Sequence, residues 1–418
     1  MSKTKSVFLA AISGNILEYY DFTVYSVFSS IIGRTFFPGE SEFTQILFSL
    51  AVFAVGFATR PIGGILFGYI GDRYGRRIAL IISMLGMTIP TFTMGLIPSY
   101  EDIGFYAPVM LVILRLTQGL SISGEGAGTA IFILEHYRNL KPGFTTGLVH
   151  GSNITGTLIA SFVGIMIEQY YPDVYFAWRF AFILGGCMGI IGFYLRLRVS
   201  ETPIFRLLTR KKKTLKAPFT NVIQTALPSM VITFCLGGVA SSIVYLVKTY
   251  VNVFYHNVLH LDNTTSLIYL SYASIILMIA LPISGGIADR IGKFKMIVLS
   301  SIAILFLALP TLLFMAAVTP WKQILALTIL GMLAGGIAGT AYIFVISLFK
   351  PEQRYSGVAF SYNLGIAIFG GTSPVISRWL VEVTGLFYAP AFYIMATSCI
   401  FLIVIYNMRY VIRELIKD

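Results

Sequence analysis

Two carboxylates, Glu18 and Asp21, lie within the first long apolar stretch of this 418-residue chain. Together with Asn15 and Tyr25 they recur at steps of three and four residues, which places all four side chains on one face of a helix. A charge near the centre of a bilayer costs about 2.5–3.5 kcal/mol or more, so such groups face a cavity or a partner. Neighbouring carboxylates also raise each other's proton affinity. The pattern predicts that one of them carries a proton, and structural bonding to neighbouring helices is the alternative.

A second set of ionisable residues lies in a later apolar stretch, at 106–132. Arg115 stays charged at any working pH, and Glu125 follows ten residues later, near the same helical face. Arg115 could restrain a proton-binding carboxylate or bind the carboxylate of a substrate. The alternative is a structural ion pair between Arg115 and Glu125, or with Glu18 or Asp21. The predicted proton-coupling group is Glu18, Asp21, Arg115 and Glu125.

Polar residues in the other apolar stretches are candidates for contact with a substrate. His150 is of a type that titrates near neutral pH, and Lys248 lies well inside an apolar run. A hydrogen-bonded packing role for the histidine and a lysine that extends to the membrane surface are the alternatives. The tyrosines at 245, 250, 342 and 362 could line a pocket or simply pack. The predicted substrate-binding set is Asn15, Tyr25, Arg115, His150, Tyr245, Lys248, Tyr342 and Asn363.

A charged, glycine-rich turn occurs twice, at 68–77 and at 285–293. In both copies an Asp-Arg pair follows a glycine by four residues, and a second glycine and a basic residue come next. The two aspartates are 217 positions apart (289 − 72), about half the chain, which predicts two similar helical bundles. The turns could latch helix ends in one state, or serve membrane orientation alone. Together with the arginine that precedes Pro61, the predicted gating set is Arg60, Asp72, Arg73, Arg76, Arg77, Asp289 and Arg290.

The composition excludes a soluble domain. Hydrophobic residues make up 56% of the chain and charged residues 11%, against about 25% charged residues in ordinary domains. Long uninterrupted apolar runs favour membrane helices over the alternating strands of a barrel. We therefore predict an all-α polytopic membrane protein. The sequence has no Walker loop, no nucleophile elbow and no metal-spaced His/Cys set, so we expect neither enzyme activity, nor a metal, nor a cofactor.

The apolar runs predict twelve transmembrane helices in two pseudo-symmetric six-helix bundles. The expected domains are a bundle at 1–197, a basic cytoplasmic linker at 198–224 and a bundle at 225–418. Lys and Arg gather on one side of this topology, which places both termini in the cytoplasm and argues against nucleic-acid binding despite the net charge of +12. The expected spans are 8–33, 44–70, 78–98, 106–132, 144–169, 178–196, 225–252, 265–288, 296–318, 323–348, 356–379 and 388–408.

The turn at 68–77 and its repeat resemble the signature of the major facilitator superfamily. The metabolite:proton symporter branch of that superfamily, with transporters for proline and betaine, 2-oxoglutarate, citrate and shikimate, is similar over further motifs. The resemblance implies a central site reached alternately from either face, and proton symport in a bacterial inner membrane. Tyr19 and Tyr20 depart from the branch, which usually has Trp or Phe there. The motifs that carry the branch resemblance are Gly14–Phe22, Arg60–Gly64, Arg115–Glu125, Glu201–Pro203 and Phe369–Gly371.

The expected function is import of a small carboxylate-bearing metabolite by a proton-coupled symporter. Intramembrane cations exceed their obvious partners in the sequence, which favours an organic acid such as a di- or tricarboxylate. A zwitterionic osmolyte of the proline or betaine type is the alternative, and a membrane sensor that binds without transporting is a more distant one. The expected partners of the chain, itself a monomer, are the substrate, protons and the lipid bilayer.

Overall fold

The computed structural model describes residues 3–39, 41–137, 141–171, 176–410 and 412. Every regular element among them is a helix, and ten of these helices are long and apolar enough to cross a membrane. The other two predicted spans, 8–33 and 44–70, each fall on two successive helices. The prediction of an all-α, polytopic membrane protein is confirmed.

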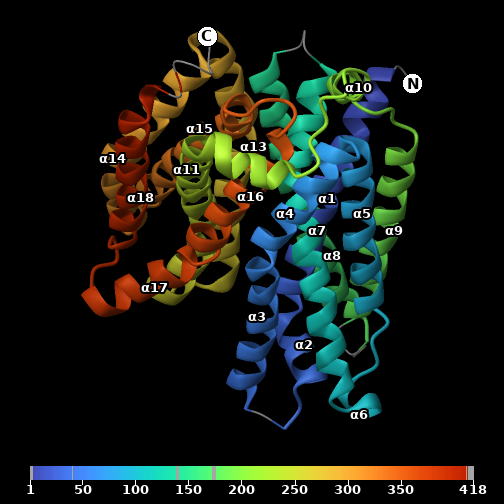
Figure 1. The fold of residues 1–418 in the computed structure, drawn as a ribbon. Coiled ribbons are helices and arrows are strands. Elements are labelled where there is room, and N and C mark those ends of the chain that lie inside the picture. The colour runs from blue at the N-terminus through green and yellow to red at the C-terminus, as the bar shows by residue number, and fades with distance from the viewer. Residues whose placement is uncertain (1–2, 40, 138–140, 172–175, 411, 413–418) are drawn as a thin grey trace. The chain divides into compact units, whose positions relative to one another are not determined.

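The first of two compact units comprises residues 1–136 and 152–218. The long helices α1, α5, α7 and α9 run side by side within it (Figure 1). Close contacts between glycines and backbone carbonyls, such as Gly119 against Gly56, bring α3 and α7 together. The helices of this unit are α1 (Lys3–Val27), α2 (Ser29–Phe36), α3 (Glu42–Ala58), α4 (Arg60–Arg73), α5 (Arg76–Met94), α6 (Tyr100–Ile103), α7 (Tyr106–His136), α9 (Trp178–Leu197) and α10 (Pro203–Arg210).

The second unit comprises residues 137–151 and 219–418, so the helix α8 (Pro142–Tyr170) is divided between the two units. The predicted domain limits at 197 and 225 stay a prediction. Three stretches of this unit have π-helical geometry, which often accompanies functional sites. Its elements are α11 (Pro218–Tyr245), η1 (Leu246–Tyr250), α12 (Val251–Val253), η2 (Phe254–Val258), α13 (Asn263–Ile291), α14 (Lys293–Met315), α15 (Pro320–Ser347), α16 (Arg354–Gly365), η3 (Ile366–Gly370), α17 (Ser373–Thr384) and α18 (Pro390–Asn407).

The two copies of the repeated turn have the same backbone geometry, in which a glycine with positive φ separates two helices. Gly75 separates α4 from α5 with a φ of 122°, and Gly292 separates α13 from α14 with a φ of 97°. Each glycine stands three residues after the aspartate of its turn. Only glycine adopts such angles without steric cost, so the second glycine of the motif is required by the turn itself.

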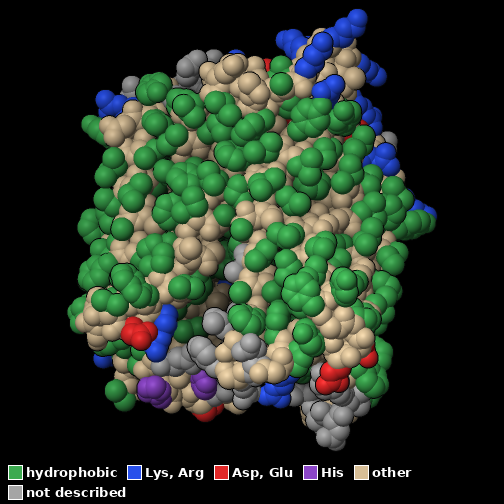
Figure 2. Space-filling model, turned by 60° about the horizontal axis from the view of Figure 1, so that its bottom comes forward, with side chains coloured by type: hydrophobic (Ala, Val, Ile, Leu, Met, Phe, Trp, Pro, Cys, Tyr) green, Lys and Arg blue, Asp and Glu red, His purple; other side chains and the backbone are tan. Residues whose placement is uncertain are grey.

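The outer surface has the character of a membrane protein. Hydrophobic side chains are spread widely over the face shown in Figure 2, and the charged side chains visible there lie mainly towards its upper and lower edges. Large apolar side chains remain exposed, among them Phe306 at 71% and Val375 at 70%. Contiguous apolar surface on this scale fits contact with lipid rather than with water.

Candidate functional site

Asp21 lies at the centre of a buried polar network in the first unit. Its carboxylate pairs with Arg115 at 3.0 Å, between Oδ2 and Nη1. The side chains of Gln118 and Thr91 donate to its Oδ1 at 3.0 Å and 2.9 Å. Three elements supply this network, since α1 carries the aspartate, α5 the threonine and α7 the other two. The Asp21 side chain thus has an arginine, an amide and a hydroxyl as partners, all drawn from neighbouring helices.

Tyr25 extends the same network along α1. The guanidinium carbon of Arg115 lies 3.7 Å from the centre of the Tyr25 ring, close enough for a cation–π contact. The Tyr25 hydroxyl donates to the backbone oxygen of Ser49 at 3.1 Å. Asn15, the other predicted member of this face, is also buried. Arg115 therefore has both an acid and an aromatic ring as neighbours.

Glu18 forms a second buried pair, with Arg60 at 3.7 Å. The guanidinium carbon of Arg60 also lies 4.6 Å from the ring centre of Phe57 and 5.2 Å from that of Phe22. These rings stabilise the arginine when it is removed from water. Arg60 thus contacts α1 and α3 at the point where α3 ends and α4 begins.

Glu125 pairs with Arg196, at the end of α9, rather than with Arg115. Arg196 Nη1 donates to Glu125 Oε2 at 2.8 Å, and Nη2 pairs with the other carboxylate oxygen. Ser83 and Thr129 donate to the same carboxylate at 2.9 Å and 3.1 Å. A side-chain carbon at Gly14 would collide with this pair, so the glycine on α1 gives it room.

The first repeated turn contributes its own buried cluster. Arg76 is fully buried and lies 3.2 Å from Asp72 and 3.3 Å from Glu135. Thr202 donates to the same Glu135 carboxylate at 2.6 Å. This cluster joins the ends of α4, α5 and α7 to the segment after α9, which gives the predicted latch residues a defined set of partners.

The segment after α9 also binds the start of α5. Glu201 accepts from the backbone N–H of Arg77 at 3.0 Å and from that of Thr202 at 2.7 Å. Burial raises the pKa of Glu201 above its ordinary value, although these backbone bonds oppose the shift. Arg77 donates to the backbone oxygen of Leu197 at 2.6 Å. Arg73, by contrast, lies at the surface, where it donates to the backbone oxygen of Lys216.

The second repeated turn uses its aspartate differently. Asp289 accepts from the backbone N–H of Gly143 at 2.7 Å and from that of Phe144 at 3.0 Å. These amides belong to the first turn of α8, where N–H groups have no partner inside the helix and the helix dipole favours a negative charge. Asp289 is therefore the N-terminal cap of α8. Arg290 is exposed.

Aromatic rings and a cation come together in the second unit. The His150 ring centre lies 5.5 Å from that of Tyr342, which lies 5.0 Å from that of Tyr362. His150 Nδ1 is 3.3 Å from the backbone oxygen of Ala338, and Lys248 lies close enough to interact electrostatically with the imidazole. The structure thus brings the predicted residues of α8, η1 and α15 together.

Tyr245 and Asn363 lie elsewhere along the helices of the second unit. Asn363 is buried on α16 and donates to the backbone oxygen of Ala359 at 2.7 Å. Tyr245 ends α11, immediately before η1, and lies against Gly370 of η3. Both residues therefore adjoin π-helical segments.

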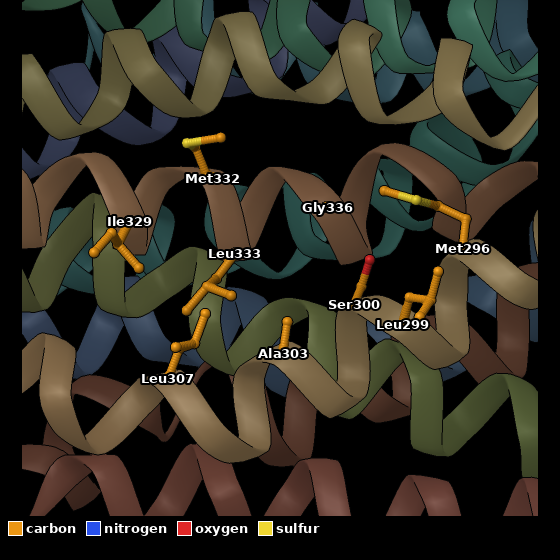
Figure 3. Close-up of a pocket in the computed structure, with 9 residues that line it drawn as sticks. All are labelled: Met296, Leu299, Ser300, Ala303, Leu307, Ile329, Met332, Leu333 and Gly336. Atoms are coloured by element: carbon orange, nitrogen blue, oxygen red, sulfur yellow. The ribbon is translucent and has the colours of Figure 1, made fainter.

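An apolar groove lies between α14 and α15 (Figure 3). Apart from the Ser300 hydroxyl, its lining side chains carry no oxygen or nitrogen. Leu299 and Met332 are 55% and 59% exposed, so the groove opens on the surface. Such a lining fits a hydrocarbon chain and offers nothing to a charged solute. Its residues are Met296, Leu299, Ser300, Ala303, Leu307, Ile329, Met332, Leu333 and Gly336.

Arg196 and Glu135 are site residues that sequence reasoning missed. Arg196 is the last residue of the expected span 178–196, just before the basic linker, and its side chain is buried. Its position inside the apolar run 178–197 was the available signal, because a cation there needs a partner. Glu135 follows an apolar run in the same way and is buried.

Comparison of the sequence with known proteins relates the chain to one family of transporters. The model of the family described as the Major Facilitator Superfamily matches residues 11–371. The glycine betaine/proline/ectoine/pipecolic acid transporter OusA of Dickeya dadantii is 32% identical over 95% of this chain and 82% of its own length. The proline/betaine transporter of Escherichia coli is 30% identical over 97% of this chain and 84% of its own length.

Solved structures agree on the fold. A double Trp mutant of XylE superimposes with a TM-score of 0.76 at 17% identity, over 99% of this chain and 96% of that one. A D-xylose–proton symporter gives a TM-score of 0.68 at 18% identity, over 96% and 97% of the two chains. The predicted twelve-helix fold is thereby confirmed.

Proposed function

The chain belongs to the major facilitator superfamily, and from that premise we propose that it imports a zwitterionic osmolyte of the proline or betaine type together with protons. Transport proceeds by alternating access, in which substrate and proton shift the balance between two states. The protein acts as a monomer in a bacterial inner membrane, with both termini in the cytoplasm.

The proposed substrate rests on the names of the related transporters. Both transporters reported above are named for betaine and proline, and the similarity extends over nearly the whole chain. The organic-acid expectation has no such support. It depended on an excess of intramembrane cations, but Arg60, Arg115 and Arg196 each lie beside a carboxylate. Because those arginines have their own counter-charges, a solute with no net charge fits the site better.

The Asp21 network supports the proton step. Protonation of Asp21 removes the negative charge that faces Arg115 at 3.0 Å. Arg115 would then keep the Tyr25 ring and the Gln118 carbonyl oxygen, 3.7 Å and 2.9 Å away, as its neighbours. Protonation therefore releases Arg115 from its carboxylate partner and allows α1 and α7 to move into the arrangement that binds substrate. Proton and substrate would therefore favour the same state, which is the condition for symport.

The two repeated turns support a latch role. The cluster around Arg76 and the cap that Asp289 places on α8 both join helix ends through charges. Such contacts can hold one state and break in another. The predicted gating set therefore remains part of the proposal.

The decisive experiment is uptake by purified protein in liposomes. An inward proton gradient is imposed, and labelled glycine betaine and proline are compared with 2-oxoglutarate and citrate. We expect accumulation of the first two solutes and its abolition by a protonophore. Accumulation of the organic acids alone would restore the original substrate prediction, and binding without accumulation would favour a sensor.

A further inference from the structure

Three aromatic rings form a continuous group in the second unit. The ring planes of His150 and Tyr342 are tilted by 59°, and those of Tyr342 and Tyr362 by 42°. His150 and Tyr342 are half-buried, and Tyr362 is buried on α16. Tilted rings at these separations expose π faces in more than one direction, and those faces carry a partial negative charge.

A fixed positive charge adjoins the rings. Lys248 is half-buried and acts electrostatically on the His150 imidazole. It belongs to η1, a π-helical segment that directly follows α11, and such segments often accompany functional sites. The π-helical segment η3 packs close by, since Gly370 has no room for a side chain beside Ser241 and Tyr245. The end of α11, directly before η1, therefore packs against η3.

We propose that the ring group of His150, Tyr342 and Tyr362 binds the ammonium end of a zwitterion and that Lys248 binds its carboxylate end. The inference rests on the proposed function and assigns the two ends of its substrate. An ammonium group is attracted to aromatic faces at up to about 6 Å from the ring centre. Lys248 offers a point charge with three donors to the carboxylate.

The arrangement selects against both kinds of net charge. A dicarboxylate would place its second negative group against the ring faces, which repel anions. A simple cation would be repelled by Lys248 without a carboxylate to offset it. A solute with both charges a few bonds apart satisfies the rings and the lysine together.

The rings should matter more for a quaternary ammonium than for a secondary one. Glycine betaine has no N–H group, so its positive end depends on aromatic faces. The ammonium of proline has two N–H groups, which can also donate to oxygen atoms. Loss of a ring therefore changes the ratio of the two affinities, and a purely packing role would lower both equally.

The test measures KM for glycine betaine and for proline in proteoliposomes. Tyr342→Leu should raise the KM for betaine roughly tenfold and that for proline by much less, while Tyr342→Phe keeps most of the betaine affinity. Lys248→Gln should raise both KM values, and Lys248→Arg should restore part of the loss. Tyr406→Leu, at a tyrosine of α18 that is 65% exposed, is the matched control and should leave both values unchanged.

Equal losses for the two solutes in Tyr342→Leu, or no loss in either, would overturn the inference. Should that variant fail to fold, position 342 is instead filled with phenylalanine carrying one, two or three fluorine atoms, which weakens the ring charge at nearly constant shape. Betaine binding should then fall with each fluorine, and constant binding would refute the cation–π contact. If the unaltered protein transports neither solute, the proposed function fails first, independently of the rings.

Discussion

The two units place charge differently, although they carry the same turn. In the first unit Asp72 is buried beside Arg76, as part of a cluster with Glu135. In the second, Asp289 accepts two backbone N–H groups at the start of α8. The backbone requirement is identical, because Gly75 and Gly292 both adopt positive φ. A repeated turn thus preserves its geometry while its carboxylate takes a different partner.

The contrast extends to the membrane-embedded residues. The ion pairs described above all lie in the first unit, where they join α1 to α4 and α7, and α7 to α9. The polar groups described in the second unit are chiefly aromatic rings, hydroxyls and a lysine beside π-helical segments. This difference suggests that the first unit handles the proton and the second the organic part of the substrate.

The largest effect is expected from Asp21→Asn. The amide cannot take up or release the proton, so uptake driven by a proton gradient should be abolished, while exchange of labelled for unlabelled substrate persists. Asp262→Asn is the matched control, because asparagine caps a helix as well as aspartate does. Proteoliposome uptake measures both. Unchanged gradient-driven uptake in Asp21→Asn would show that another residue carries the proton.

Glu125→Gln should mainly reduce stability. Removal of one partner leaves the buried Arg196 charge uncompensated, which costs about 3–5 kcal/mol. Thermal unfolding in detergent should show a lower midpoint, and the double variant Glu125→Gln/Arg196→Met should recover part of the loss. Glu101→Gln, at an exposed position, serves as control. A midpoint equal to that of the control would show that the pair is not buried as described.

Asp72→Ala and Asp289→Ala sharpen the comparison between the turns. The first removes one of the two carboxylates beside a fully buried arginine, which keeps Glu135, and a cost of about 1.5–3 kcal/mol is expected for the lost charged contact. The second removes a helix cap, and a cost of about 1 kcal/mol is expected. Asp289→Asn should be milder still, since asparagine can accept one of the two backbone bonds. Equal losses of thermal stability in both alanine variants would remove the distinction drawn here.

The smallest effect is a pH dependence that arises from Glu201. Burial raises the pKa of its carboxyl in the folded protein, so folding favours the protonated form. Its stabilising contribution is complete below the ordinary pKa of a glutamate and is lost as the pH rises through the raised value. Glu201→Gln should remove that slope from a plot of unfolding midpoint against pH. An unaltered slope in Glu201→Gln would show that the pH dependence arises from another titratable group.

Local patterns in the sequence determined the class of the protein and the positions of its helices. Hydrophobic run length is a property of each segment alone, so the membrane helices follow from it. The cost of intramembrane charge singled out Glu18, Asp21 and Arg115 without knowledge of their partners. The sequence also indicated that the repeated turn requires a glycine, because a positive φ is a local property of the turn.

Only the tertiary structure decided which charges meet. Arg115 and Glu125 lie on the same helix, but ten residues separate them by about 15 Å along the axis, so each takes its partner from another helix. Arg115 pairs with Asp21 on α1, and Glu125 with Arg196 on α9. The π-helical segments that present Lys248 and follow Tyr362 likewise depend on packing between helices. Helical periodicity states which way a side chain points, whereas its partner depends on which neighbour lies at the same depth.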